Sequence, residues 1–254
     1  MTEVCVRLVG PVAICREGRR YAGGDLGSRK ARTLIALLSV EPGRLVSMDR
    51  IVEMLWGDCP PRRPPANVAT LVSRLRSTFG PDLIVGGRAG YRLGDEVTTD
   101  LDEAAELLVA AGTRLAAGYP VRALGAATAA LGLIGGESVL TDEPDATWTE
   151  AARVAHRELL RRSRHMVALA AIRAGDLTTA VTAARAGVTA DPLDEAACRL
   201  LMSAYCALDE PGRALRVYEN LRATLAGELG CDPARVTREM HLAILRDDLS
   251  SLTA

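Results

Sequence analysis

Aromatic residues are scarce in this 254-residue sequence, where they make up 3% of the chain. Its hydrophobic cores must therefore be built from Leu, Val, Ile and Ala. No apolar run reaches the roughly 18 residues that a membrane-spanning helix needs. The start at Met1 also lacks the basic and apolar stretches of a signal peptide. We therefore expect a cytoplasmic protein.

Motifs for metal binding, redox chemistry and catalysis are also lacking. The six cysteines include no CxxC pair, and the three histidines include no i, i+4 pair. Neither a GxSxG elbow nor a phosphate-binding loop ending in Gly-Lys-Ser/Thr occurs. We expect that the protein is not an enzyme and that it holds no cofactor and no metal.

Charge is distributed unevenly along the chain, although the net charge is only −1. Residues 1–95 carry 15 basic and 9 acidic side chains, a net of +6, whereas residues 96–254 carry 16 and 23, a net of −7. Such an asymmetry suggests that the basic half contacts nucleic acid.

The first hundred residues mix short β-prone runs with helical patterns. Runs at 4–8 and 12–15 predict a strand pair. Apolar residues at helical spacing predict helices that begin after Ser28 and Ser47, and Ser47 is suited to cap the second of them. The prolines within 57–65 predict a loop.

A further helix is predicted over residues 66–79, and its two faces differ sharply. One face is apolar, with Val68, Leu71, Val72, Leu75 and Phe79 at helical spacing. The opposite face has short, polar or cationic side chains and no acidic residue. Its members are Ala66, Asn67, Thr70, Ser73, Arg74, Arg76 and Ser77. Short side chains allow a helix to enter the DNA major groove, where Asn and Arg can contact base edges.

The run at 83–93 predicts a β-hairpin with Arg88 at its tip. A strand pair, three helices and a terminal hairpin form the order of a winged helix-turn-helix, which inserts its last helix into the major groove. We expect Asn67, Thr70 and Arg74 to read bases, with Ser73 and Ser77 on the same DNA-facing surface. Arg62, Arg63, Arg76 and Arg88 are expected to hold phosphates.

Residues after Asp100 are helical nearly throughout by pattern. Helices are predicted over 102–117, 121–134 and 147–172, with a loop at 135–145. Residues 171–180 align with residues 205–214 at an offset of 34, the period of tetratricopeptide repeats. Small residues such as Ala180 and Ala214 suit the close approach of stacked helix pairs. A generic Ala-rich bundle is the alternative for this region.

Several motifs along the whole chain resemble the Streptomyces antibiotic regulatory protein family. They include Leu55-Trp56-Gly57-Asp58, Val72-Ser73-Arg74-Leu75-Arg76, Gly90-Tyr91-Arg92-Leu93, Asp191-Pro192-Leu193-Asp194-Glu195 and Glu228-Leu229-Gly230-Cys231-Asp232-Pro233. The resemblance implies an OmpR-like winged helix over residues 1–97, followed over residues 98–254 by a bacterial transcriptional activation domain with tetratricopeptide-like helical repeats. The fold class is thus mainly α with a small α+β N-terminal domain.

The family resemblance also implies a function. It implies an activator of a secondary-metabolite, or antibiotic, gene cluster that binds direct repeats of double-stranded DNA as a homodimer and recruits RNA polymerase holoenzyme with its sigma factor. Residues 131–136 depart from the Trp-Arg-Gly turn of many members, so the resemblance does not predict the conformation of the loop there. Two alternatives remain open: a helical-repeat adaptor that binds only proteins, and a DNA-binding repressor.

Overall fold

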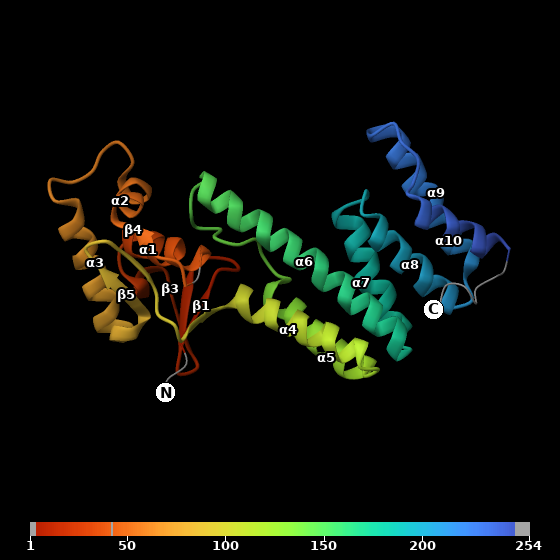
Figure 1. The fold of residues 1–254 in the computed structure, drawn as a ribbon, viewed down its shortest axis with the longest axis horizontal. Coiled ribbons are helices and arrows are strands. Elements are labelled where there is room, and N and C mark those ends of the chain that lie inside the picture. The colour runs from red at the N-terminus through yellow and green to blue at the C-terminus, as the bar shows by residue number, and fades with distance from the viewer. Residues whose placement is uncertain (1–3, 42, 247–254) are drawn as a thin grey trace. The chain divides into compact units, whose positions relative to one another are not determined.

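The chain packs into two compact units that do not follow the sequence order. A computed structural model describes residues 4–41 and 43–246. Contacts group Met1–Ala105 with Leu133–Glu158 as the first unit, and Glu106–Gly132 with Leu159–Ala254 as the second. The chain passes between them within α4 (Asp100–Ala116), α5 (Pro120–Ile134) and α6 (Thr147–Ala174) (Figure 1). Residues 133–158, expected in the second domain, therefore pack with the first unit.

A four-stranded sheet in the order β3-β2-β1-β7 forms one side of the first unit. The predicted strand pair is confirmed as β1 (Val4–Arg7) antiparallel to β2 (Ala13–Arg16). The strands β3 (Arg19–Ala22) and β7 (Val97–Thr99) were not predicted. Arg19 and Arg20 leave β3 without apolar alternation, and β7 spans only three residues, so neither gives a strand signal in the sequence.

Three helices cover the core of this unit. The predicted cap is confirmed: Ser47 Oγ accepts a hydrogen bond from Arg50 N at the start of α2 (Met48–Trp56). Ser28 Oγ likewise accepts one from Ala31 N at the start of α1 (Arg29–Val40). These helices and α3 (Pro64–Phe79) enclose a shared core. Its fully buried members include Leu34, Leu38, Ile51, Leu55 and Val68. Short 3-10 turns, η1 (Gly23–Leu26) and η2 (Pro81–Leu83), complete the connections.

A loop between α5 and α6 is built into the first unit; we call residues 138–146 the strap. Gly10 N donates to Ser138 O at 2.8 Å, Leu140 N donates to Leu8 O at 2.8 Å, and Thr141 N donates to Gly10 O at 3.1 Å. The side chains of Val139 and Leu140 are fully buried in the core of this unit. The strap thus adds hydrogen bonds and apolar contacts next to the β1–β2 connection.

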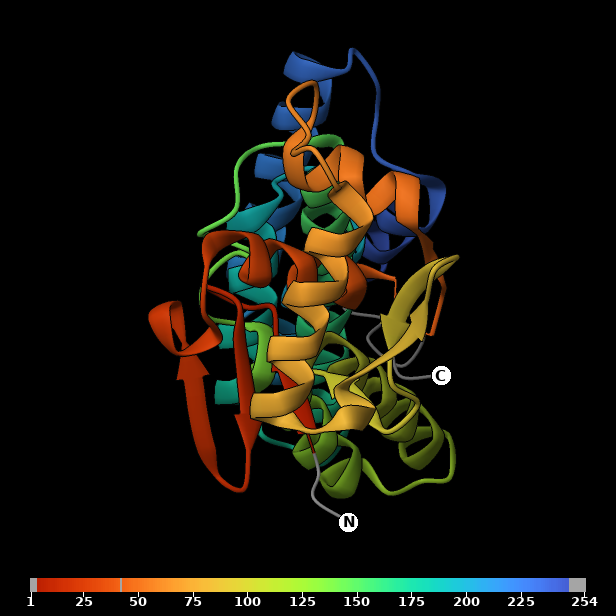
Figure 2. The same ribbon diagram turned by 90° about the vertical axis from the view of Figure 1, so that its left-hand side faces the viewer.

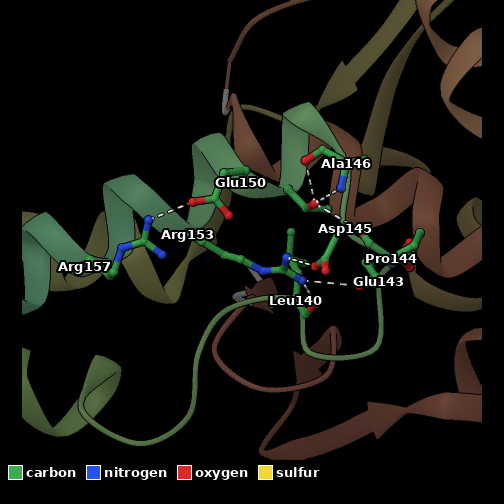
Figure 3. A network of polar contacts seen from close by, with 9 residues as sticks. Leu140, Glu143, Pro144, Asp145, Ala146, Glu150, Arg153 and Arg157 are labelled. Carbon is green, nitrogen blue, oxygen red and sulfur yellow. Dashed lines mark hydrogen bonds and ion pairs between the residues drawn. The ribbon is translucent and has the colours of Figure 1, made fainter.

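Polar side chains also hold residues 140–145 of the strap. Asp142 Oδ1 accepts a hydrogen bond from Val12 N at 3.1 Å, and the Thr33 hydroxyl lies 3.0 Å from Glu143 Oε2. The guanidinium of Arg153, on α6, donates to the carbonyls of Leu140 and Glu143 at 3.3 Å each and pairs with Asp145 (Figure 3). One arginine therefore contacts the strap at three of its residues.

The second unit contains α7 (Leu177–Ala190), α8 (Glu195–Ala207), α9 (Pro211–Glu228) and α10 (Arg235–Leu245). The 34-residue repeat recurs in its hydrogen bonds. Asp176 N donates to Ala171 O and Glu210 N to Tyr205 O, both at 2.9 Å. Ala180, like its counterpart Ala214, is fully buried. The repeat found in the sequence thus corresponds to a repeated helix connection.

The predicted fold class is confirmed: a small α+β winged helix-turn-helix region and helical repeats in a mainly helical chain. Within residues 4–41 and 43–246, no helix is both long and apolar enough to cross a membrane.

Candidate nucleic-acid interface

The helix α3 begins earlier than the sequence suggested. Pro64 and Pro65, predicted to belong to a loop, are the first residues of the helix. Proline is tolerated there because the first helical N–H groups have no acceptor within the helix, and its fixed φ suits the helical conformation. No side chain caps this end. The proline-rich loop is therefore shorter than predicted, and its last prolines start α3.

The two faces of α3 lie as predicted from the sequence. Val68, Val72, Leu75 and Phe79 are buried against the core, with exposed fractions of 0–3%. The other face is exposed; its members are Ala66, Asn67, Thr70, Ser73, Arg74 and Ser77. Figure 2 shows α3 facing the viewer. No acidic residue occurs between Asp58 and Asp82, so this face carries only positive charge.

Four of the predicted phosphate or base contacts have unpaired guanidinium groups. Arg62 and Arg63 are exposed in the loop before α3, Arg74 is exposed on α3, and Arg88 is exposed at the turn of the hairpin. None of these four makes a side-chain hydrogen bond or ion pair within the described part of the chain. Their charges are therefore available to an external anion.

Arg76 is placed differently from the other predicted phosphate contacts. Its Nε donates to Ile84 O at 2.7 Å, and one terminal nitrogen donates to Gly86 O at 3.4 Å. Its guanidinium carbon also lies 5.8 Å from the ring centroid of Tyr91. This arginine faces the hairpin, and its side chain is only partly exposed.

The predicted hairpin is confirmed as β5 (Ile84–Gly87) and β6 (Gly90–Leu93), joined by Arg88 and Ala89. A third strand, β4 (Val46–Ser47), pairs with β6 and gives a sheet in the order β4-β6-β5. Gly90 is required at this junction, because a Cβ there would lie 2.2 Å from Val46 O. The hairpin lies beside α3 in Figure 2.

Two hydrogen bonds that anchor the hairpin turn and join α1 to α2 were not predicted from the sequence. Met48 N, at the start of α2, donates to Ala89 O in the turn at 3.2 Å. Lys30 of α1 donates to Leu55 O at the end of α2 and lies 5.9 Å from the ring centroid of Trp56. These bonds join elements that are distant in sequence, and no local motif marks them.

The distribution of charge over the two compact units differs from its distribution over the two halves of the sequence. Residues 57–93, which include α3 and the hairpin, carry six arginines and two aspartates, a net of +4. Residues 96–105 and 133–158 carry ten acidic and two basic side chains, a net of −8, yet they belong to the first unit. The second unit, residues 106–132 and 159–254, carries 14 basic and 13 acidic side chains. The net charges of the two sequence halves therefore do not map onto the two units, since the most basic and the most acidic segments both belong to the first unit.

Comparison with known proteins agrees with this geometry. The model of the bacterial transcriptional activator domain matches residues 99–245. The chain belongs to this family. Regulatory protein AfsR of Streptomyces coelicolor is 33% identical over 252 residues, covering 97% of this chain and 25% of AfsR. Transcriptional regulator RedD of the same organism is 27% identical, covering 96% of this chain and 71% of RedD. The predicted membership in the Streptomyces antibiotic regulatory protein family is thus confirmed.

A solved structure extends the likeness to the fold. EmbR of Mycobacterium tuberculosis, in complex with a low affinity phosphopeptide, matches with a TM-score of 0.86 at 27% identity, over 97% of this chain and 66% of EmbR. The chain spans about a quarter of the length of AfsR. AfsR is named a regulatory protein and RedD a transcriptional regulator.

Proposed function

We propose that this chain is a sequence-specific DNA-binding activator of transcription, whose recognition helix is α3. The observation that carries the proposal is the exposed face of α3, which has no acidic residue and lies beside a hairpin with an unpaired arginine at its turn. An exposed helix face that served only solubility would mix acidic with basic side chains.

The proposed DNA contacts fall into two groups, those to base edges and those to phosphates. Asn67, Thr70 and Arg74 contact base edges, because Asn and Arg offer paired groups to adenine and guanine. Ser73 and Ser77 are short enough to let the helix approach the groove floor. Arg62, Arg63 and Arg88 flank the helix and bind phosphates, which fix the orientation of the protein on the duplex.

The two parts of the chain have separate roles in this proposal. Residues 1–97 form the OmpR-type DNA-binding domain, and residues 98–254 form the activation domain, which contacts RNA polymerase holoenzyme and its sigma factor in the cytoplasm. The target is the promoter of a secondary-metabolite gene cluster, as the family membership suggests. Two copies bind a direct repeat, because one recognition helix reads too few base pairs to select a site within a genome.

A footprint of the full chain on the promoters of neighbouring genes tests this function. We expect protection of two half-sites about 10–10.5 base pairs apart, so that both recognition helices meet one face of the duplex. Inserting about five base pairs between the half-sites should abolish cooperative binding, and inserting about ten should partly restore it.

Other outcomes separate the rival functions. Absence of any sequence preference in the footprint would favour the protein-binding adaptor. Protection accompanied by reduced transcription in vitro would identify a repressor. A footprint that is unchanged by the five-base-pair insertion would show independent monomers.

A further inference from the structure

We propose that Arg76 is a positioning residue that holds the hairpin β5–β6 against α3, and that it does not contact phosphate. The expected effect of Arg76 on DNA binding rests on the proposed function, whereas its contacts with the hairpin do not depend on that function. Arg76 is the one arginine of α3 whose guanidinium is committed to the protein's own backbone, whereas Arg74, two residues earlier, is exposed and without a side-chain partner in the described residues.

The contacts of Arg76 match the edge of the hairpin sheet. In the order β4-β6-β5, the strand β5 is an edge strand, so one side of its backbone has no strand partner. Ile84 and Gly86 are two residues apart on β5, and carbonyls at this spacing point to the same side of a strand. Arg76 donates to both of these carbonyls. Its planar guanidinium thus occupies the position that a further strand would take.

A second contact joins the same guanidinium to the middle strand. Tyr91 of β6 is buried, with an exposed fraction of 5%, and its ring lies under the Arg76 guanidinium at 5.8 Å. A planar group with several fixed donors can bond two carbonyls while it lies over the face of a ring within cation–π range. The compact ammonium of lysine cannot reproduce this combination.

The consequence concerns Arg88, which lies at the turn of this hairpin. On its other side the hairpin is held by β4, which pairs with β6 as far as Gly90, and by the bond from Met48 N to Ala89 O in the turn. Loss of Arg76 releases the β5 edge and leaves the position of Arg88 relative to α3 less well defined. Arg76 therefore affects DNA binding through Arg88, and the two side chains should not act independently.

Amide hydrogen exchange of the free, full-length protein tests the geometry without DNA. In Arg76→Ala, exchange should become faster at the amides of residues 84–93 and at Met48, because the hairpin opens more readily. Arg74→Ala is the matched control, since it removes the same group from the same helix, and it should leave these amides unchanged. Unchanged exchange of the hairpin in Arg76→Ala would overturn the proposal.

A double-mutant cycle on duplex DNA tests the consequence. Arg88→Ala should flatten the dependence of log affinity on log salt concentration by about one unit, as expected for one lost phosphate contact. In the Arg76→Ala background, Arg88→Ala should have little further effect on affinity or on this slope. Additive losses, with the slope reduced by about two units in the double variant, would show that Arg76 is a phosphate contact.

Arg76→Lys provides a second variant that keeps the charge. The proposal predicts that it resembles Arg76→Ala in both measurements, whereas a phosphate contact predicts near wild-type affinity and slope. Far-ultraviolet circular dichroism establishes that each variant is folded. If the wild-type protein bound no DNA, the proposed function would fail while the exchange experiment would still decide the role of Arg76.

Discussion

Residues 57–93 and the acidic segments 96–105 and 133–158 belong to one compact unit, but their charged groups are arranged in opposite ways. On the first, Arg62, Arg63, Arg74 and Arg88 are exposed and have no side-chain partner in the described residues. On the second, the acidic groups are largely engaged. Asp100 accepts hydrogen bonds from Leu8 N and Val9 N; the other engaged acidic residues are Asp102, Asp142, Glu143, Asp145, Glu150 and Glu158.

This difference separates charges used for binding from charges used for folding. An exposed, unpaired guanidinium contributes little to stability, and its removal should weaken only the binding of an external anion. A carboxylate that accepts backbone hydrogen bonds satisfies buried N–H groups, which are costly to leave unpaired. Substitutions of the exposed arginines in residues 57–93 should therefore change DNA binding, whereas substitutions in the acidic segments should change the free energy of unfolding.

The largest expected effect is on stability, from Leu140→Ala in the strap. Leu140 is fully buried in the core of the first unit. Truncating such a side chain should lower the free energy of unfolding by about 2–5 kcal/mol. Leu45→Ala is the matched control, because Leu45 belongs to the same unit and is 51% exposed. Urea denaturation measures both, and equal unfolding midpoints for the two variants would show that the strap does not contribute to the core.

The next effect is on binding, from Arg74→Ala. At the true operator, it should cost about 1–3 kcal/mol of binding free energy and relax specificity at one base pair. The unfolding midpoint should stay near that of the wild type, because the side chain has no described partner to lose. Binding assays on operator variants measure the change, with Arg216→Ala, an exposed arginine of α9, as the control. Wild-type affinity in Arg74→Ala would remove α3 from the role of recognition helix.

The smallest effect should come from Glu143→Gln in the strap. Burial raises the pKa of the Glu143 carboxyl, although the hydrogen bond from Thr33 acts in the opposite direction. The folded protein thus disfavours the ionised form, and the charge reduces stability at neutral pH. Glutamine keeps an oxygen that can accept from Thr33, so the variant should be slightly more stable than the wild type at neutral pH. This advantage should shrink as the pH falls through the raised pKa and Glu143 becomes protonated. Urea midpoints across pH measure it, and a less stable variant at neutral pH would contradict this account.

The features that could be predicted from the sequence are those set by local patterns. The stripe from Val68 to Phe79 fixed which face of α3 is exposed, and Ser28 and Ser47 marked two helix starts. The hairpin was marked by its glycines, of which Gly86 and Gly90 have positive φ values of 125° and 154°. Each of these signals lies within a few residues of the element that it specifies.

The strap and the role of Arg76 could not be predicted in this way. Leu140 bonds to Leu8, and Asp142 to Val12, across 130 or more residues, and no local motif marks such pairs. The sequence assigns both Arg74 and Arg76 to contacts with DNA, since both are arginines of α3 outside its buried stripe. Only the position of the β5 edge distinguishes them, and that position depends on tertiary packing.

The salt dependence of DNA binding tests the central claim most directly, because it counts the phosphates that the cationic side neutralises. The full-length wild type should be compared with a triple variant, Arg62→Ala, Arg63→Ala and Arg88→Ala, on the same operator duplex. The account predicts that the slope of log affinity against log salt concentration becomes shallower by about three units in the triple variant, with an unchanged unfolding midpoint. An equal slope in both proteins would contradict the assignment of this side of the first unit to DNA.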